Sequence, residues 1–318
     1  MPIDCYASEE HFADHLAPVY EQLEDPGDFI LGGSLSQRSS PRWPNPQTVV
    51  RDSERPVLVA SYGDVKRVRK QGRKRIAFIE HGAGQSYCTG HGSYAGGTDR
   101  DDVSLFMVPN QYSANLWRSA YPDAQVEIIG CPKLDSLPRK ERSDPPTIAI
   151  GFHWDCYLVP ETVSAFSHYR SVLPELAEAY NLIGHGHPRA QPILARRYRR
   201  MGIDLISAFS EVCRMADLYI CDNSSSLYEF AATGRPVVVL NQPMYRKDVH
   251  HGLRFWDAAN VGVQVDDPGR LLEAVALALT DPPYLQEARE QALGLVYQYR
   301  SGASQRAAGL LQAWASQC

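Results

Sequence analysis

Three histidines follow apolar or glycine-rich segments, where an imidazole could work beside a ligand. His81 begins the sequence His-Gly-Ala-Gly, His187 lies in Gly-His-Gly-His-Pro, and His251 lies in His-His-Gly. Imidazole exchanges protons near neutral pH, and its N–H groups can bind phosphate. The three residues are therefore candidate catalytic groups. Each histidine could instead have a structural role, with its ring hydrogen-bonded within its own loop. The sequence leaves both interpretations open.

A serine-rich turn supplies a second kind of chemistry. Ser224, Ser225 and Ser226 follow the apolar run 218–221 and precede a short segment with helical spacing, 227–233. Hydroxyls and unpaired N–H groups at the start of a helix bind anions, above all phosphate. The serines are therefore candidate ligands of a diphosphate, although an ordinary helix N-cap explains the same pattern.

Other polar and aromatic residues follow the ends of predicted strands or enter the same helix. Arg246 could neutralise phosphate charge, Trp154 could flank a base, and Glu229 could bind ribose hydroxyls. Trp154 could equally be a core aromatic, and Glu229 could simply face solvent. Asp135 could bind a ligand or cap the linker segment that follows it. The further candidates for the ligand-binding cleft are Gly82, Asp135 and Asp222.

Several common catalytic motifs are absent from the sequence. The histidine pair at 185 and 187 has no third ligand at a metal-binding spacing, so no metal site is predicted. The chain has no Gly-x-Ser-x-Gly elbow for a serine nucleophile. It also lacks the Gly-x-Gly-x-x-Gly and Gly-x-x-x-x-Gly-Lys-Ser/Thr loops, which argues against a dinucleotide oxidoreductase and a P-loop enzyme. We expect no metal and no organic cofactor.

Short apolar runs alternate with helical segments along the chain, which predicts α/β structure with parallel sheets. Ligands of such sheets bind beyond the carboxyl ends of the strands. The predicted strands are 29–31, 57–61, 76–80, 105–108, 126–129, 147–151, 181–184, 218–221, 237–240 and 261–265. The predicted helices are 11–23, 63–71, 113–120, 163–180, 207–215, 227–233, 268–279 and 284–316, the last with a kink near Gly294 or Gly302.

The charged, proline-rich segment 138–146 is the best candidate for a linker. It predicts two domains, 1–141, completed by 300–318, and 142–299. We expect both to be Rossmann-like and doubly wound, facing a cleft, with the C-terminal helices crossing back.

Composition narrows the class of protein. The chain has 318 residues, a hydrophobic share of 44% and a formal net charge of −5, so the whole molecule is not a general polyanion binder. The basic segments 66–75 and 196–200 could bind an anionic polymer or a membrane surface, or they could be solvated helix faces. Seven scattered cysteines without a Cys-x-x-Cys pair, no export signal and no transmembrane-length run predict a cytoplasmic protein, with peripheral membrane contact left open.

Taken together, the motifs resemble the CDP-glycerol glycerophosphotransferase family, the teichoic-acid polymerase group of GT-B-fold transferases. The family's Trp-His-Gly element appears as Glu80-His81-Gly82, and its Lys-Pro-His-Pro element appears as 185–188. Its Ala-Asp-x-x-Ile-Thr-Asp-Tyr-Ser-Ser signature matches 216–225, with Asn223 in place of tyrosine. Its Gly-Tyr-Pro-Arg-x-Asp element matches 130–135. The resemblance covers roughly residues 76–280 and is strongest at 216–240.

The resemblance implies a metal-independent transferase that moves a glycerol-phosphate or glycosyl group from a nucleotide-diphosphate donor to an acceptor hydroxyl. The donor would be CDP-glycerol or a nucleotide sugar, bound by domain 142–299, and domain 1–141 would serve the acceptor. Ser224–Ser226 would hold the donor diphosphate. His187 and His251 would stabilise the departing nucleotide phosphate, and His81 would be the base for the acceptor hydroxyl.

Two other functions remain open at this point. A nucleotide-sugar 2-epimerase would share this architecture, and a catalytically silent module could bind a polyanion or nucleic acid through the basic segments. The acceptor hydroxyl could itself lie on an anionic polymer or a nucleic acid. The nucleotide base, the transferred group and the oligomeric state are not determined by the sequence.

Overall fold

The computed structural model describes residues 1–32, 54–83, 94–253 and 255–317. Its described residues form two compact units. Unit 1 combines Met1–Gly84, Gly92–Ser136 and Tyr297–Cys318, and unit 2 contains Leu137–Val296. The chain therefore changes unit within a few residues of the predicted linker and again just before the predicted return at 300.

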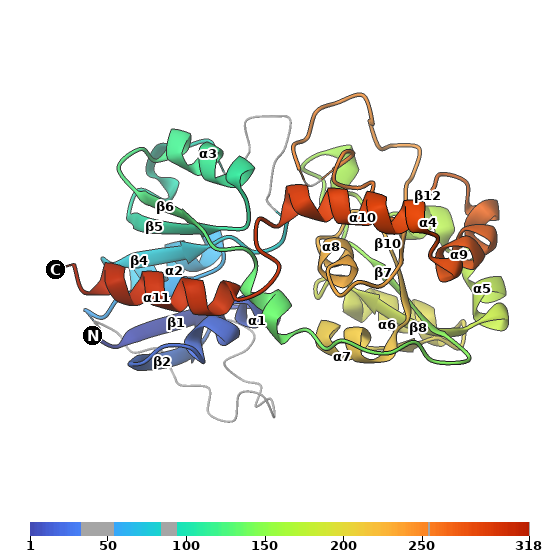
Figure 1. The fold of residues 1–318 in the computed structure, drawn as a ribbon, viewed down its shortest axis with the longest axis horizontal. Helices are drawn as coiled ribbons and strands as arrows, with labels where there is room; N and C mark the ends of the chain where they lie inside the picture. The colour runs from blue at the N-terminus through green and yellow to red at the C-terminus, as the bar shows by residue number, and fades with distance from the viewer. Residues whose placement is uncertain (33–53, 84–93, 254, 318) are drawn as a thin grey trace. The chain divides into compact units, whose positions relative to one another are not determined.

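Unit 1 contains a six-stranded parallel sheet in the order β2-β1-β3-β4-β5-β6 (Figure 1). Because β2 and β3 flank β1 on opposite sides, the winding direction reverses between β1 and β3. The strands are β1 Ile3–Ala7, β2 Pro26–Leu31, β3 Val57–Val59, β4 Ile76–Ile79, β5 Val103–Val108 and β6 Gln125–Ile128. The helices are α1 Glu10–Tyr20, α2 Tyr62–Lys70, α3 Gln111–Ala120 and α11 Ala303–Ala315, with 3-10 turns η2 Gly97–Asp99 and η3 Pro132–Ser136.

The first strand, β1, was missed by the sequence analysis. All of its residues are buried, including Asp4. The Asp4 carboxylate accepts a hydrogen bond from the backbone N–H of Asp28 at 2.8 Å and forms an ion pair with the buried Arg73 at 2.7 Å. A charged residue can therefore occupy the sheet interior because its partners arrive from distant segments.

Helix α11 completes one face of the unit 1 sheet. Its residues Ala307, Leu311 and Trp314 belong to the same buried cluster as Leu16 of α1 and Leu58 of β3. Figure 1 shows α11 in red, and this helix lies against α1. The other face of the sheet forms a second core with α2 and α3.

Unit 2 contains a second six-stranded parallel sheet, in the order β12-β11-β10-β7-β8-β9. The strands are β7 Thr147–Phe152, β8 Asn181–Gly186, β9 Asp204–Leu205, β10 Leu218–Cys221, β11 Val237–Leu240 and β12 Val263–Val265. The helices are α4 Phe166–Tyr169, α5 Leu173–Ala179, α6 Gln191–Arg199, α7 Phe209–Met215, α8 Ser226–Ala231, α9 Leu271–Thr280 and α10 Pro283–Val296, with 3-10 turns η4 Pro160–Thr162 and η5 Pro268–Arg270. The winding of this unit starts at β7, proceeds outward through β8 and β9, and returns to the other side of β7 with β10.

Two predicted helices are divided in the structure. The segment predicted as one helix over 163–180 forms α4 and α5, and Pro174 stands in the first turn of α5, where its missing N–H costs no helical hydrogen bond. The predicted helix 284–316 is divided into α10 and α11. The break ends at Gly302, which has a φ of +67°, whereas Gly294 lies inside α10. The predicted break near Gly302 is therefore confirmed, and the alternative at Gly294 is wrong.

The basic segment 196–200 lies at the C-terminal end of α6, a helix that the sequence analysis did not predict. Leu194 and Tyr198 of this helix are buried, while the neighbouring arginines are exposed. The segment is thus one solvated face of an amphipathic helix. None of the helices in the described ranges combines the length and apolar composition needed to cross a lipid bilayer.

Gly130 offers a test of how closely the segment between α10 and α11 packs against the chain just after β6. Its φ is +87°, and a Cβ at this position would lie 2.3 Å from the carbonyl oxygen of Tyr299. We expect Gly130→Ala to lower the free energy of unfolding by about 1–3 kcal/mol. Gly309→Ala, on the exposed side of α11 with no atom within 4 Å of the new Cβ, should raise it by about 0.5–1 kcal/mol.

Urea unfolding of both variants, followed by circular dichroism, measures these differences. A Gly130→Ala protein as stable as the Gly309→Ala protein would show that this close approach is wrong.

Candidate functional site

In unit 2, a ligand is expected beyond the carboxyl ends of β7 and β10, because the strand order reverses between them. Asp222, directly after β10, is completely buried at this position. Its carboxylate accepts hydrogen bonds from the backbone N–H groups of His153 at 2.9 Å and Ala165 at 3.1 Å. Asp222 therefore ties the loop after β7 to the end of β10. These contacts indicate that Asp222 has a structural role at this edge of the sheet.

The predicted serine turn lies at the same edge, between β10 and α8. The Ser226 hydroxyl is 3.0 Å from the Ser224 hydroxyl and 3.1 Å from that of Tyr219. Ser225 makes no side-chain capping bond to α8, and its side chain is partly exposed. Ser225 therefore occupies the N-cap position of α8 without a capping bond from its side chain, and its role as a phosphate ligand stays a prediction. Because α8 has only six residues, hydroxyls and turn N–H groups are more important here than a helix dipole.

His187 has a defined protonation pattern. The backbone N–H of Arg189 donates to its Nδ1 at 3.2 Å. An accepting Nδ1 cannot carry a proton, so the neutral ring carries its proton on Nε2. The ring is partly exposed. His187 can therefore present an N–H donor to an anion, as its predicted role requires.

Trp154 lies beside His187. Their ring centroids are 6.1 Å apart, and the ring of His153 is 5.2 Å from that of His187. The guanidinium carbon of Arg189 lies 4.9 Å from the centroid of the Trp154 ring. Trp154 is partly exposed, so the core-aromatic alternative is wrong. Its role beside a nucleoside stays a prediction.

Arg246 and His251 are both held by Glu161, a residue that the sequence analysis did not single out. The guanidinium of Arg246 donates from Nε at 2.6 Å and from Nη2 at 2.8 Å, and its backbone N–H donates at 2.9 Å. Nε2 of His251 lies 3.1 Å from Oε2 of Glu161, the oxygen that also accepts from Nη2 of Arg246; it is close but not aligned as a hydrogen bond. Glu161 stands in the short turn η4 and belongs to no motif, so the sequence carried no signal for it.

Burial and charge set the protonation of this group. Burial raises the pKa of Glu161, but the hydrogen bonds from Arg246 outweigh this effect and bring the pKa down to about 2. Burial lowers the pKa of His251, and Arg246 acts in the same direction, although Glu161 opposes both. His251 is therefore neutral at neutral pH, and its side chain is not accessible to solvent. The predicted role of His251 at the departing phosphate stays a prediction, and a positive charge on this ring is not supported at neutral pH.

Two further predicted site residues have clear places in the fold. Glu229 is 1% exposed, so the alternative that it faces solvent is wrong; ribose binding stays a prediction. Asp135 accepts hydrogen bonds from the backbone N–H groups of Gly302 and Ser304, each at 2.7 Å. It therefore caps α11 and not the linker that follows it, and this role accounts for both of its oxygens without a ligand.

His81 follows β4 in unit 1, and Gly82 beside it has a φ of +79°. Nδ1 of His81 lies 2.5 Å from the carbonyl oxygen of Ala60. A carbonyl oxygen only accepts, so Nδ1 carries the proton and Nε2 is the basic nitrogen of the neutral ring. This is the protonation pattern that a general base requires.

Helix α1 surrounds His81 with side chains that the sequence analysis missed. The ring centroid of Phe12 lies 4.9 Å from that of His81, and those of His11 and His15 each lie 6.2 Å away. Burial lowers the pKa of His15 well below its ordinary value, and the charge of Lys133 acts in the same direction. The spacing of four between the two helical histidines was the available signal, since it places both on one helix face.

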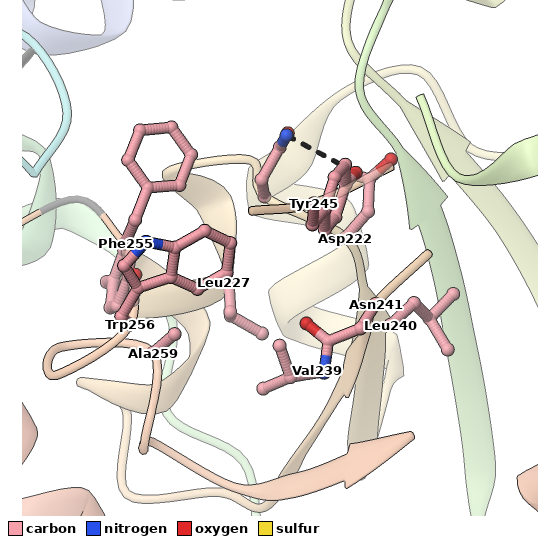
Figure 2. Close-up of a pocket in the computed structure, with 11 residues that line it drawn as sticks. Asp222, Leu227, Val239, Leu240, Asn241, Tyr245, Phe255, Trp256 and Ala259 are labelled. Carbon is pink, nitrogen blue, oxygen red and sulfur yellow. Dashed lines mark hydrogen bonds between the residues drawn. The ribbon is translucent and has the colours of Figure 1, made fainter. Parts of the chain in front are cut away.

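A pocket lies beyond the ends of β10 and β11 in unit 2 (Figure 2). Most of its lining is apolar. Figure 2 shows Phe255 and Trp256 on one side and Tyr245 near Asp222 on the other. The amide of Asn223 donates to the Tyr245 hydroxyl at 3.3 Å. Only Asp222 among the predicted site residues lines this pocket.

No group of three or more histidine, cysteine or acidic side chains within the described ranges is arranged to hold a metal ion.

The model of the CDP-glycerol:poly(glycerophosphate) glycerophosphotransferase family matches residues 162–309. The predicted family resemblance is confirmed. The matched range contains the serine turn, His187, Arg246 and His251. No curated protein matches the chain by sequence.

Similar solved structures cover nearly the whole chain. The wall teichoic acid polymerase TagF is 13% identical with a TM-score of 0.65, over 99% of this chain and 89% of that one. A protein from Listeria monocytogenes assigned as a UDP-N-acetylglucosamine 2-epimerase is 13% identical with a TM-score of 0.59, over 98% and 95%. HepE from Anabaena, solved with UDP-glucose, is 11% identical with a TM-score of 0.53, over 98% and 100%. These similarities confirm the predicted GT-B-like α/β fold class.

The hydrogen bonds of Asp222 predict a specific loss on substitution. Asp222→Asn keeps the shape but replaces one accepting oxygen by a donating amide, so one of the two backbone N–H groups loses its partner. We expect the free energy of unfolding to fall by about 1–3 kcal/mol. Hydrogen exchange at the amides of His153 and Ala165 should also become faster, whereas the exposed control Asp248→Asn should change neither. Unchanged exchange at both amides would contradict the proposed tie.

The lowered pKa of His15 predicts a pH dependence of stability. The unfolded chain binds a proton at this residue near pH 6.5, and the folded chain does not, so stability is full above that pH and falls as the pH decreases. We expect His15→Gln to reduce the slope of unfolding free energy against pH between 7.5 and 5.5, by at most about 1.4 kcal/mol per pH unit. A variant with the same slope as the wild type would show that His15 is not responsible.

Proposed function

We propose that the protein transfers a glycerol-phosphate or glycosyl group from a nucleotide-diphosphate donor to an acceptor hydroxyl. The observation that carries this proposal is the opposite protonation of two histidines by their backbone partners. His187 has its neutral-state proton on Nε2 and can donate to a phosphate, whereas His81 has its basic nitrogen at Nε2 and can accept a proton. Transfer to a hydroxyl needs one group of each kind.

In the proposed reaction, His81 accepts the proton of the acceptor hydroxyl as the acceptor oxygen attacks. With CDP-glycerol, the new bond forms at the β-phosphorus and the bond to the departing CMP breaks. With a nucleotide sugar, the new bond forms at the anomeric carbon and the nucleoside diphosphate departs. In either case, negative charge grows on the leaving phosphate, where the N–H of His187 and the Ser225 hydroxyl stabilise it.

This proposal revises the roles expected from the sequence in one respect. His251 is buried and neutral beside Glu161, so it supports Arg246 and its loop instead of donating a positive charge to the leaving group. His187, Ser225 and Arg246 are then the groups that meet the donor phosphates. Trp154 and Glu229 are the proposed contacts of the nucleoside.

The polyanion-binding alternative receives less support from the structure. In the basic segment 66–75, Arg69 pairs with Asp101 at 2.7 Å and Arg73 pairs with Asp4 at the same distance. Arg75 donates to the carbonyl oxygen of Trp314 at 3.1 Å. Much of the segment's charge is therefore used within unit 1.

Nucleotide binding is the first test. Isothermal titration with CDP, UDP, CDP-glycerol and UDP-N-acetylglucosamine should give saturable binding by at least one of them. Ser225→Ala should weaken that binding about tenfold, as expected for the loss of one hydrogen bond to a charged group. The matched control Ser210→Ala, in α7 of the same unit, should not change it. Absence of binding by all four compounds would remove the transferase proposal.

Substitution of His81 and of His187 should have different effects on kcat and on nucleotide affinity. We expect His81→Ala to reduce kcat by at least about a hundredfold while leaving the nucleotide Kd within about twofold, because a base acts on the acceptor. His187→Ala should lower kcat and also weaken nucleotide binding, because its N–H meets the donor. Product analysis with UDP-N-acetylglucosamine and no acceptor distinguishes transfer from 2-epimerisation. Equal turnover by wild type and His81→Ala would exclude His81 as the base.

A further inference from the structure

Between β11 and β12, the described chain contains no helix or strand, yet this loop carries Arg246 and His251. Side chains on such a loop need an anchor outside it to hold one orientation. Their shared contact is Glu161, whose side chain is completely buried, while that of Arg246 is 41% exposed. One hidden carboxylate thus contacts both residues.

The turn that carries Glu161 is itself fixed. The hydroxyl of Thr162 donates to the carbonyl oxygens of Cys156 at 2.5 Å and Val159 at 2.8 Å. Nδ1 of His153 lies 3.2 Å from the carbonyl oxygen of Thr162. Because the backbone of His153 is held by Asp222, the position of Glu161 is set by the end of the central strand β10.

We propose that Glu161 is a positioning residue of the donor site, which orients the guanidinium of Arg246 and the imidazole of His251 through a single buried carboxylate; this rests on the function proposed above. The guanidinium of Arg246 is planar, and its Nε and Nη2 edge is already hydrogen-bonded to the carboxylate of Glu161. Its position and tilt are then fixed, and its Nη1 side is directed away from Glu161. An anionic ligand meets a charge that is already oriented.

A purely structural role explains this arrangement less well. Burying a carboxylate is costly, and an apolar pair of similar volume would hold two loops together without that cost. The ion pair also leaves the guanidinium of Arg246 partly exposed to solvent, where an anion can contact it. An apolar pair in the same place would not attract an anion. The contact with Glu161 therefore orients the guanidinium of Arg246 in addition to holding its loop in place.

The test compares Glu161→Gln with Glu211→Gln. The control removes the carboxylate of another Glu–Arg pair of unit 2, the exposed pair with Arg214. We expect Glu161→Gln to weaken binding of CDP or UDP about tenfold and to raise KM for the donor more than it lowers kcat. The control should bind within about twofold of the wild type. Circular dichroism and urea unfolding establish that each variant is folded.

A double-mutant cycle with Arg246→Lys separates positioning from an independent effect. If Glu161 acts through Arg246, the double variant should bind nucleotide no more weakly than the weaker single variant. Additive losses, or a folded Glu161→Gln protein with wild-type affinity, would overturn the proposal. If Glu161→Gln does not fold, Arg246→Lys alone decides: it keeps the charge but loses the two-pronged contact, so unchanged affinity would overturn the proposal as well.

Ring-nitrogen NMR of His251 provides a readout that needs no nucleotide. Loss of the neighbouring carboxylate should change the tautomer or the apparent pKa of His251 in Glu161→Gln and not in Glu211→Gln. If the wild type binds no nucleotide, the proposed function fails, but an altered His251 signal still shows that Glu161 orients this loop. An unchanged His251 signal in a folded Glu161→Gln protein contradicts the positioning role whatever the nucleotide result.

Discussion

The site in unit 2 depends on one buried carboxylate, that of Asp222. It accepts hydrogen bonds from two backbone N–H groups in the segment between β7 and α4, and these bonds offset the cost of burying its charge. These bonds join two neighbouring strand ends at the point where the winding direction of the sheet reverses. The serine turn begins directly after Asp222 and therefore starts at this junction.

The same principle extends outward in steps. Asp222 holds the backbone at His153, the loop beyond His153 carries Glu161, and Glu161 contacts Arg246 and His251. The contacts of the two buried carboxylates, Asp222 and Glu161, join separate segments of the chain, so the arrangement can be rigid even though the loops contain little regular structure. Such rigidity would favour the proposed binding of a diphosphate, because the hydrogen-bond donors of the site need not be reoriented when the ligand arrives.

Much of the fold could be predicted from sequence because parallel strands are short, apolar and nearly continuous. The run 237–240 is an example, and it forms β11 as expected. The prediction failed for β1, where Asp4 interrupts the apolar pattern and its partner Arg73 is far away along the chain. It also failed for α5, because helical spacing over 163–180 outweighed the proline within it. Local patterns do not record which distant groups will neutralise a charge.

In the candidate site, the sequence shows which residues are present but not how they are protonated. Sequence motifs identified His81 and His187, but a motif cannot say which ring nitrogen carries the proton. That is decided by the backbone: a carbonyl oxygen at Ala60 requires a proton on Nδ1 of His81, whereas an N–H at Arg189 requires a lone pair on Nδ1 of His187. Two identical side chains thereby acquire opposite chemistry at their Nε2 atoms. The backbone partner of each imidazole is consequently as much a part of its function as the histidine itself.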